Sequence, residues 1–549
     1  MYRVITSLVI FALILTDSLL SQVIFKGTFQ STQGYPLPHY YISVNDLTTP
    51  ADPPHWETEQ AGDQEFLFEL PHQGPYLIQV AAVNHISGFL ILYTHKKTDT
   101  IYATIRMTPY RYKKRIDTLK IIGSWNNFDF ETGEMMQRVN DHQFQYSRIA
   151  DSDTLAYQIV GLVSSGRSIN GQQSDAYTYD GGGDFESVLY VKKGQRVTIT
   201  IDTRNLQGSR EPAPPSFVAD EAHHYLATLN QFNHTVQVEL NKFYTAVGEY
   251  RKQHQGNMDG FSYSLSPQIL KFLQKQLNQS ILPIQEIGAI ATLVLARATG
   301  SVPAALIQKA LHILSPTSRG WAINPYTLYY LGSPKDSIQF PYQLESIYRQ
   351  NPAEKVKAIA LQIMMQLARK NQDESQFLKY YNTLKQQYGH YKRFERILQR
   401  FNPDPPIQKG KKLADFSVPS LDGTQTYRIS QFKGKYVLLD FWAVWCGPCH
   451  GEMPYLHQAY QTYKKRGFVI LSLSFDQSPA AVEKFRQKKW PMPWYHAFVA
   501  QGFNSNIARK LNIQAIPHPI LIGPDGTILA QGDQLRGKQL LQTLAQILP

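Results

Sequence analysis

The chain has only two cysteines among 549 residues, and this scarcity excludes a fold held together by several disulfide bridges. The two cysteines, Cys446 and Cys449, are separated by Gly447 and Pro448. A bridge across so short a loop constrains little of the unfolded chain, so it contributes little to stability. A Cys-x-x-Cys pair is instead typical of a redox couple, in which one thiol is acidic enough to attack another disulfide.

Long hydrophobic runs are also missing after the N-terminus. Residues 1–21 have the pattern of a secretory signal: Arg3 supplies the positive charge, residues 4–15 are mostly apolar, and Ser21 offers a small residue for cleavage before Gln22. The apolar stretch is short for a membrane span. No cysteine follows for a lipid anchor. We expect export to a bacterial periplasm or cell envelope, with an uncleaved, membrane-tethering N-terminus as the alternative.

The excess of positive charge is modest. Lys and Arg number 55 against 43 Asp and Glu, a net charge of +12 that is spread along the chain. This distribution favours solubility and weak attraction to acidic surfaces, and we expect no nucleic-acid partner. Hydrophobic residues make up 43% of the chain, which is enough for buried cores in about three or four domains.

Two β-rich segments, 22–114 and 115–205, follow the signal. Their strand-like runs alternate or are rich in β-branched and aromatic residues, with Pro and Gly between them. The runs are 40–44, 65–70 and 76–80 in the first segment, and 121–129, 144–146, 188–191 and 197–201 in the second. We expect a small β-sandwich from each segment.

The stretch from Gly123 through Trp125 and Phe128 to Asp129 reads Gly-Ser-Trp-Asn-Asn-Phe-Asp. It is similar to the opening of starch- and glycogen-binding early-set modules, in which aromatic side chains stack on sugar rings. The resemblance implies a glycan contact through the Trp125 region. The alternative is a structural module in which the aromatic residues belong to the core.

Residues 216–402 are predicted to be α-helical, after a Pro-rich linker at 211–215. Apolar faces recur at 281–297, 356–367 and 377–388, and Asn351-Pro352 is expected to start a helix with Pro in its first turn. No 34-residue repeat is evident.

The adjacent His223 and His224 do not predict a metal site, because neighbouring residues on a helix point in different directions. We expect both to be solvated, and we expect no metal and no cofactor.

Residues 409–549 resemble the thioredoxin fold, in its TlpA/ResA-like extracytoplasmic branch. The matching motifs are Ala414-Asp415-Phe416, Leu421-Asp422-Gly423, Phe432-Lys433-Gly434-Lys435, the apolar strand 436–442, and the Cys-x-x-Cys pair that opens a helix containing Pro454. A strand at 468–475, a helix near 481–488 and a strand pair at 520–522 and 528–530 joined by Asp525-Gly526 complete the order. The whole chain is thus expected to be multi-domain: β-sandwich modules, a helical region and a C-terminal α/β thioredoxin fold.

The resemblance gives each residue of the pair a role. Cys446 would be the exposed nucleophile at a helix N-terminus, where free N–H groups stabilise a thiolate. Cys449 would be the resolving thiol, so that the two form the redox disulfide. Gly447 and Pro448 would shape the turn and contact substrate, and this Gly-Pro pair is that of reducing thioredoxins, with potentials near about −270 mV.

Two carboxyl groups are candidates for the base that deprotonates Cys449. Asp440 lies six residues before Cys446 and matches the buried acid of cytoplasmic thioredoxins, where desolvation raises the pKa. Glu452 lies three residues after Cys449, hence on the same helix face, and matches the acid of the TlpA/ResA-like branch. We favour Asp440, and Glu452 is then a surface or ion-paired carboxylate.

Ile516 and Pro517 match the cis-proline segment, in which the Ile516 backbone is expected to pair with an extended substrate beside Cys446. Trp445 is expected to be a partly exposed aromatic residue that contacts the substrate. Trp442 is expected in the core. His518 stands where thioredoxins commonly have Thr; it either biases the thiolate or binds a partner, or is a tolerated surface side chain. Ser472 replaces the Lys that many thioredoxins place near the buried acid.

The sequence therefore favours an exported thiol–disulfide oxidoreductase that reduces disulfide-containing envelope proteins. The resemblance implies cytochrome c maturation as one role and a membrane thiol as electron donor. A peroxiredoxin-like peroxidase is a weaker alternative, since Ala443 stands where a peroxidatic cysteine usually has Thr or Ser. A glycan- or protein-binding envelope scaffold with an accessory redox domain is the alternative of another class.

Overall fold

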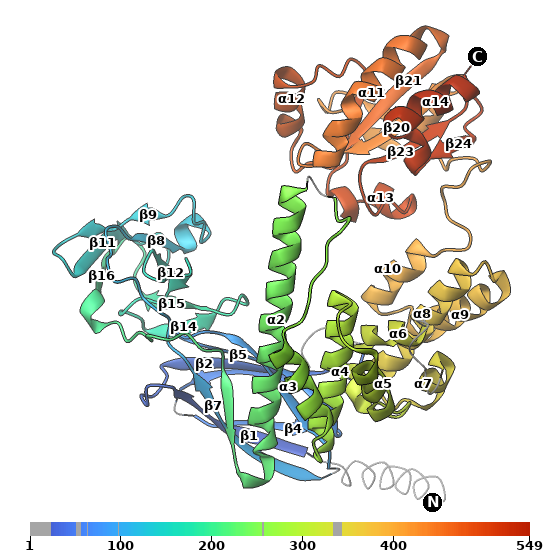
Figure 1. Cartoon of the computed structure of the whole chain (residues 1–549). Coiled ribbons are helices and arrows are strands. Elements are labelled where there is room, and N and C mark those ends of the chain that lie inside the picture. The colour runs from blue at the N-terminus through green and yellow to red at the C-terminus, as the bar shows by residue number, and fades with distance from the viewer. Residues whose placement is uncertain are drawn as a thin grey trace, which may run out of the picture. The chain divides into compact units, whose positions relative to one another are not determined.

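The computed structural model describes residues 23–50, 56–62, 64–96, 98–254, 257–332 and 343–548. The chain divides into two compact units, Met1–Leu384 and Lys385–Pro549 (Figure 1). The predicted signal at residues 1–21 lies outside the described residues. Among the helices that are described, none is both long and apolar enough to cross a bilayer.

The first unit opens with a β-sandwich of two four-stranded sheets. One sheet has the order β17-β7-β1-β4 and the other β3-β2-β5-β6. The strands of this part are β1 (Val23–Ser31), β2 (His39–Asp46), β3 (Trp56–Ala61), β4 (Phe66–Leu70), β5 (Gly74–Ala82), β6 (Gly88–Thr94), β7 (Asp99–Met107) and β17 (Ser216–Ala219). Alternate residues of β1 and β4 are buried, and Phe29 and Tyr40 stack across the two sheets at 4.1 Å between ring centroids.

Strand β17 differs from the expectation that residues 216–402 are helical throughout. It pairs antiparallel with β7, with Phe217 opposite Ile105, and Phe217 is buried. The chain therefore returns to the first sandwich after completing the second β module. Four residues are too short a run for sequence periodicity to distinguish a strand from the start of a helix.

The second module has one three-stranded and one six-stranded sheet. The orders are β10-β11-β16 and β14-β15-β12-β8-β9, with β13 paired to β12. The strands are β8 (Lys120–Gly123), β9 (Glu134–Met135), β10 (Gln137–Arg138), β11 (Gln143–Ile149), β12 (Thr154–Val160), β13 (Ser168–Ile169), β14 (Ala176–Tyr179), β15 (Phe185–Tyr190) and β16 (Arg196–Asp202). This module packs against the first sandwich through Tyr41 and Tyr179, whose rings stack at 3.9 Å.

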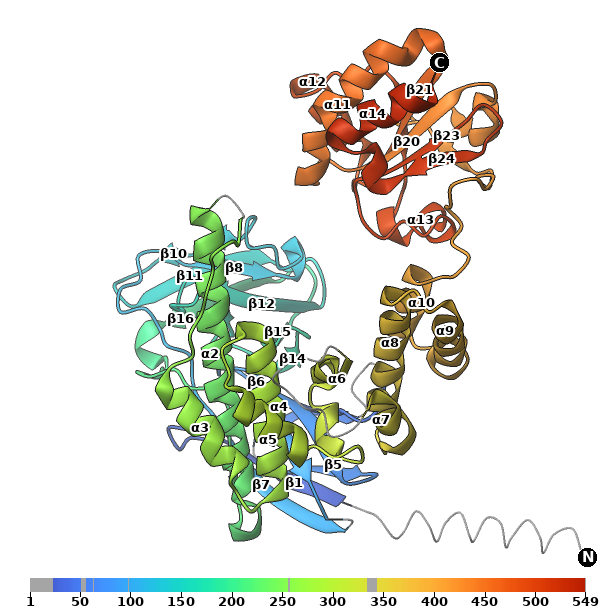
Figure 2. The same cartoon turned by 45° about the vertical axis from the view of Figure 1, so that its right-hand side comes forward.

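The middle region is helical. Its helices are α2 (Tyr225–Gln253), α3 (Pro267–Leu277), α4 (Leu282–Thr299), α5 (Ala304–Ile313), α6 (Tyr329–Gly332), α7 (Leu344–Gln350), α8 (Glu354–Lys370), α9 (Glu374–Tyr388) and α10 (Lys392–Arg400). Helix α4 packs against α2, α3 and α5 (Figure 2), and most of its residues are buried, as expected of a helix that is apolar on all sides.

Two local predictions in this region were wrong. Helix α8 starts at Glu354, so Pro352 precedes the helix instead of lying in its first turn. Asn351 makes this possible, because its side chain accepts a hydrogen bond from the Ala353 N–H at 2.9 Å. His223 is buried, not solvated.

The burial of His223 has a clear cause. Its ring nitrogens contact Asp99 at 3.1 Å and Asp220 at 2.7 Å, so it ties the start of β7 to the segment before α2. His224 is exposed. In the described part of the chain, no three His, Cys, Asp or Glu side chains come together in a group that could hold a metal ion.

The second unit contains a five-stranded sheet with the order β22-β21-β20-β23-β24. Strands β20, β21 and β22 are parallel, β23 pairs antiparallel with β20, and β24 pairs antiparallel with β23. The elements are β18 (Ser417–Pro419), β19 (Thr426–Arg428), β20 (Tyr436–Trp442), α11 (Gly447–Tyr463), β21 (Phe468–Ser474), α12 (Pro479–Lys488), β22 (Tyr495–Phe498), α13 (Asn506–Lys510), β23 (His518–Ile522), β24 (Ile528–Gln531) and α14 (Gly537–Ile547). This is the α/β order that the sequence predicts.

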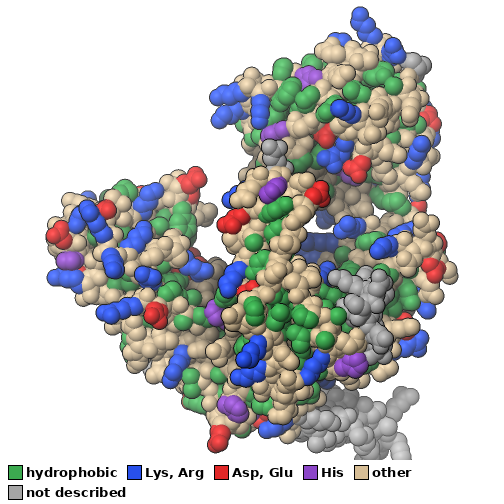
Figure 3. All heavy atoms as spheres, in the orientation of Figure 1, with side chains coloured by type: hydrophobic (Ala, Val, Ile, Leu, Met, Phe, Trp, Pro, Cys, Tyr) green, Lys and Arg blue, Asp and Glu red, His purple; other side chains and the backbone are tan. Residues whose placement is uncertain are grey.

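Charged side chains of both signs are dispersed over the one face that Figure 3 shows. On the face shown in Figure 3, Lys and Arg are scattered among acidic and uncharged side chains instead of forming one continuous basic patch. This is consistent with the even spread of the +12 net charge along the sequence.

The close pairing of β1 with β7 generates a prediction about Gly27. A methyl group on Gly27 would lie 1.8 Å from the carbonyl oxygen of Ala103, its partner on β7. We expect Gly27→Ala to destabilise the sandwich by about 1–3 kcal/mol, because the backbone must move apart. In α2, a methyl group on Gly248 would meet no described atom within 4 Å beyond its chain neighbours and the helix backbone, so Gly248→Ala should stabilise the helix by up to about 1 kcal/mol. Hydrogen exchange of β1 and β7 peptides measures the first effect and that of α2 peptides measures the second; unchanged exchange of β1 and β7 in Gly27→Ala would contradict the pairing.

Candidate active site

The cysteine pair lies where β20 ends and α11 begins. Six of the seven residues of β20 are buried, as in a central strand covered on both faces. A turn follows, in which the Cys446 N–H donates to the carbonyl oxygen of Ala443 at 3.1 Å. Cys446 is the N-cap of α11, and the Cys449 N–H donates to its Sγ at 3.2 Å. Unpaired N–H groups and the positive end of the helix dipole would thus stabilise a thiolate on Cys446.

The two sulfurs form a disulfide, with 5.3 Å between the Cα atoms. Cys446 is 4% exposed and Cys449 1%, so the prediction of an exposed sulfur at Cys446 is wrong for the oxidised pair. The reason is that both cysteines belong to the apolar core of this unit. The residues around them are accessible instead: Trp445 is 59% exposed, and Gly447 and Pro448 are exposed as well.

The turn before Cys446 is held from two sides by residues that sequence reasoning missed. The Val444 N–H donates to both carboxylate oxygens of Asp476, at 3.0 and 3.1 Å. The Val444 carbonyl accepts from His450 Nε2 at 2.8 Å. Asp476 comes two residues after the end of β21, and parallel strands end at a common edge, so its position along the strand was a usable signal.

Asp440 is buried in the middle of the sheet. It is 3% exposed, and burial raises the pKa of Asp440 to about 7, although a hydrogen bond from Ser472 acts against this and the negative charge of Glu452 acts with it. Ser472 lies opposite Asp440 on β21, and its Oγ donates to Asp440 Oδ2 at 2.9 Å. A carboxyl group with this pKa can take up and release a proton near neutral pH.

Glu452 is engaged in contacts between helices. Its Oε1 lies 3.2 Å from Arg536 Nε, and its Oε2 accepts from the Gly537 N–H at 2.5 Å. Gly537 is the first residue of α14, where a carboxylate complements the helix dipole. This is the ion-paired arrangement that the sequence left open for Glu452.

The Ile516–Pro517 peptide bond is cis, and both residues are half-buried. Because His518 pairs with Phe441, this segment lies at the same end of β20 as the cysteines. His518 is half-buried with its Nε2 buried, and that atom has no hydrogen-bond partner among the described residues. Burial lowers the pKa of His518, because strand pairing draws the residue partly into the sheet; its expected roles toward the thiolate or a partner stay predictions.

Trp125 packs within its own module. It is half-buried, its ring stacks on Tyr146 at 5.8 Å, and the Arg148 guanidinium lies 4.1 Å from its ring centroid. The cation therefore covers one face of the Trp125 ring. These contacts favour the structural interpretation of this motif.

The burial of Asp440 makes stability depend on pH. The pKa of Asp440 is about 7 in the folded protein, whereas the usual value for Asp is 3.8. Between pH 3.8 and pH 7, the folded protein therefore holds a proton that the unfolded chain has lost. The free energy of unfolding therefore falls as pH rises through this window, and the loss is complete above about pH 7. Asp440→Asn removes this pH dependence. From pH 4 to pH 8, the free energy of unfolding of the variant should therefore rise by roughly 4 kcal/mol relative to that of the wild type.

Hydrogen exchange of β20 and β21 in the full-length oxidised protein checks this, with variant and wild type compared at the same pH. Any constant cost of the amide cancels between the two pH values. Asp533→Asn, at a side chain that is 99% exposed, is the control and should show no such dependence. An equal effect of Asp440→Asn at pH 4 and pH 8 would refute the linkage.

Comparison with known proteins identifies the family of the second unit. A family described as thioredoxin-like matches residues 434–528. The thiol-disulfide oxidoreductase ResA of Bacillus cereus is 33% identical over 152 residues, which are 27% of this chain and 84% of that protein. The ResA of Oceanobacillus iheyensis is 33% identical over 154 residues, or 26% of this chain and 77% of that protein.

A solved thioredoxin domain of a thiol-disulfide oxidoreductase from Bacteroides vulgatus is 29% identical. The match covers 26% of this chain and 99% of that domain, with a TM-score of 0.24. All three relatives match only about a quarter of the chain, and the matched family segment contains both cysteines. Through this C-terminal domain, the chain belongs to the thioredoxin-like thiol–disulfide oxidoreductases and is an enzyme of that class.

Proposed function

We propose that the protein is an exported reductant of disulfide bonds in bacterial envelope proteins. The observation that carries this is the Cys446–Cys449 pair at the start of α11, with the buried Asp440 on the strand that leads to it. The N-terminal pattern of charge and apolar residues supports export. The Gly-Pro pair between the cysteines supports a reducing couple.

The reaction follows from these positions. The Cys446 thiolate attacks one sulfur of the substrate disulfide, forming a mixed disulfide and releasing one substrate thiolate. Cys449 then loses its proton to Asp440 and attacks Cys446 Sγ, which releases the second substrate thiolate. Two electrons have passed to the substrate, and the enzyme is left as the Cys446–Cys449 disulfide. A membrane thiol donor would reduce it again.

Asp440 is the base that the contacts favour over Glu452. Trp494 contacts His457 and Tyr460 of α11 and is joined through Ser472 to Asp440. Asp440 therefore lies on the sheet face that α11 covers, the helix that carries Cys449. Glu452 already holds Arg536 and the first N–H of α14.

The exposed rim around the pair is the proposed docking surface for substrate. It comprises Trp445, Gly447 and Pro448, together with Phe503, which is 38% exposed and lies 6.5 Å from the Trp445 ring. Sequence reasoning missed Phe503. The family resemblance adds the Ile516 backbone, and it suggests the haem-binding cysteines of c-type cytochromes as one substrate class.

Substrate capture tests the proposed function directly. In Cys449→Ser the resolving thiol is missing, so we expect mixed disulfides between Cys446 and envelope proteins to accumulate. They should dissociate on adding dithiothreitol. Cys446→Ser is the matched control and should trap none. If both variants trap the same small set, or neither traps any, the envelope-reductase proposal is wrong.

The direction of electron flow is tested by the reduction potential. Full-length protein is equilibrated in graded dithiol buffers, and its free thiols are alkylated and counted by mass. We expect a value near that of thioredoxin, about −270 mV. A value above about −200 mV would identify an oxidant or isomerase, and the reductase proposal would fail.

A further inference from the structure

A chain of hydrogen bonds runs from the buried acid to β22. Ser472 Oγ donates to Asp440 Oδ2 at 2.9 Å, and Trp494 Nε1 donates to Ser472 Oγ at 2.9 Å. Trp494 is 8% exposed and Ser472 fully buried. The three residues come from different parts of the sequence, on β20, on β21 and just before β22.

The chemistry of the indole gives this chain one direction. An indole N–H is only a donor, so Ser472 must accept it, and its single hydroxyl proton is then free to donate to Asp440. A hydroxyl that accepts a hydrogen bond is also a stronger donor. The carboxylate form of Asp440 is therefore stabilised at Oδ2, where the partner is neutral.

The surrounding charged and titratable groups do not replace this neutral chain as the feature that favours the carboxylate form of Asp440. From α11, Glu452 adds a like charge that raises the pKa of Asp440, and His457 packs against the Trp494 ring. From β22, His496 lies opposite Ser472. Burial lowers the pKa of both histidines, that of His496 to about 4, so both are neutral near pH 7.

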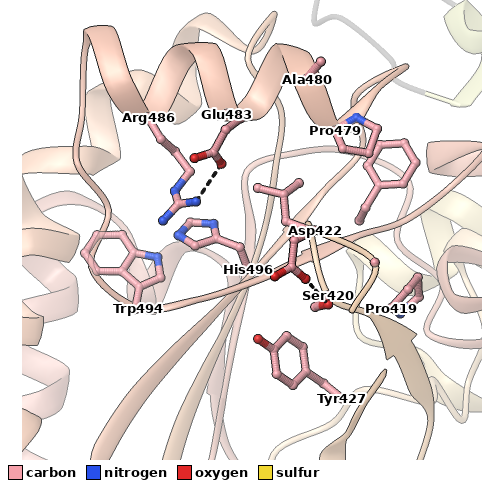
Figure 4. Close-up of a pocket in the computed structure, with 13 residues that line it drawn as sticks. Pro419, Ser420, Asp422, Tyr427, Pro479, Ala480, Glu483, Arg486, Trp494 and His496 are labelled. Carbon is pink, nitrogen blue, oxygen red and sulfur yellow. Dashed lines mark hydrogen bonds and ion pairs between the residues drawn. The ribbon is translucent and has the colours of Figure 1, made fainter. Parts of the chain in front are cut away.

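Of the other neighbours, His518 faces away and Arg486 is already paired. His518 on β23 pairs with Phe441, which points to the sheet face opposite to that of Asp440. Arg486 on α12 contacts Glu483 at 2.8 Å. Arg486, Trp494 and His496 together line a pocket of about 670 Å³ between α12 and the β18–β19 hairpin (Figure 4).

We infer that Ser472 and Trp494 are positioning residues that set the pH at which Asp440 exchanges its proton. Ser472 supplies the hydrogen bond, and Trp494 acts through Ser472 by fixing the direction of its hydroxyl. The functional meaning of this inference rests on the proposed role of Asp440 as the base for Cys449. The hydrogen bonds themselves are present in the disulfide form and can be tested there.

The experiment is a carboxyl ¹³C titration of Asp440 in the oxidised full-length protein labelled with [4-¹³C]aspartate. Asp440→Asn identifies the resonance. In the oxidised protein the cysteines do not titrate, so the result is independent of redox activity. Ser472→Ala should raise the midpoint by about one pH unit or more, the value of a hydrogen bond to a charged group. Ser472→Thr keeps the hydroxyl and should restore the wild-type midpoint.

Trp494→Phe should raise the midpoint in the same direction by a smaller amount. Phenylalanine is chosen because a small residue would open Ser472 to the adjoining pocket. Trp490→Phe is the matched control: Trp490 contacts His457 at 5.3 Å but takes no part in the hydrogen-bond chain, so its variant should keep the wild-type midpoint.

The double variant Ser472→Ala, Trp494→Phe separates positioning from general structural support. If Trp494 acts only through Ser472, the double variant has the midpoint of Ser472→Ala alone. A further rise would overturn the relay, as would wild-type midpoints in both single variants. Failure of the relay would leave substrate trapping and the reduction potential unchanged, and failure of those two tests would leave the titration result standing.

Discussion

The desolvated carboxyl group of Asp440 is the constraint on which the redox site depends. It lies in the centre of the sheet, where an ionised group is costly without partners. The hydrogen bond from Ser472 favours the charged form, whereas burial and the charge of Glu452 favour the neutral one. The balance leaves a group that can hold or release a proton near neutral pH. Its partners are neutral side chains, in place of the lysine common in thioredoxins.

The cysteine pair depends on the same sheet for its position. Strand β20 delivers the chain to the start of α11, and hydrogen bonds to Asp476 and from His450 fix the intervening turn at Val444. Cys446 then caps the helix, where free N–H groups stabilise a thiolate. Exposed aromatic and turn residues surround a nearly buried disulfide, so access to the sulfur is controlled by its neighbours.

The first unit is built differently. Its first β-sandwich is completed by a strand that lies far from the other strands in the sequence. Strand β17, which pairs with β7, follows the whole second module in the sequence, so that module is an insertion between two parts of one sheet. Stacking of Tyr41 on Tyr179 fixes the two β modules together. The close contacts of Trp125 with Tyr146 and Arg148 lie within the second β module, and the redox chemistry is assigned to the second unit alone.

The sequence by itself determined the thioredoxin-like order of elements, the redox pair and the candidate acids, because strand periodicity, the Cys-x-x-Cys spacing and the motif order are local signals. It also predicted a β-rich first part and a helical middle region, although it did not identify strands β1 and β7 or helix α2 individually. It could not predict strand β17, the burial of His223 between Asp99 and Asp220, or the enclosure of Cys446 in the core, since each requires residues distant in sequence to meet. Only the tertiary structure decided that Trp494 and Ser472 reach Asp440, because hydrogen-bond direction and desolvation arise from the packing of β20, β21 and the segment before β22, and leave no pattern along any one of them.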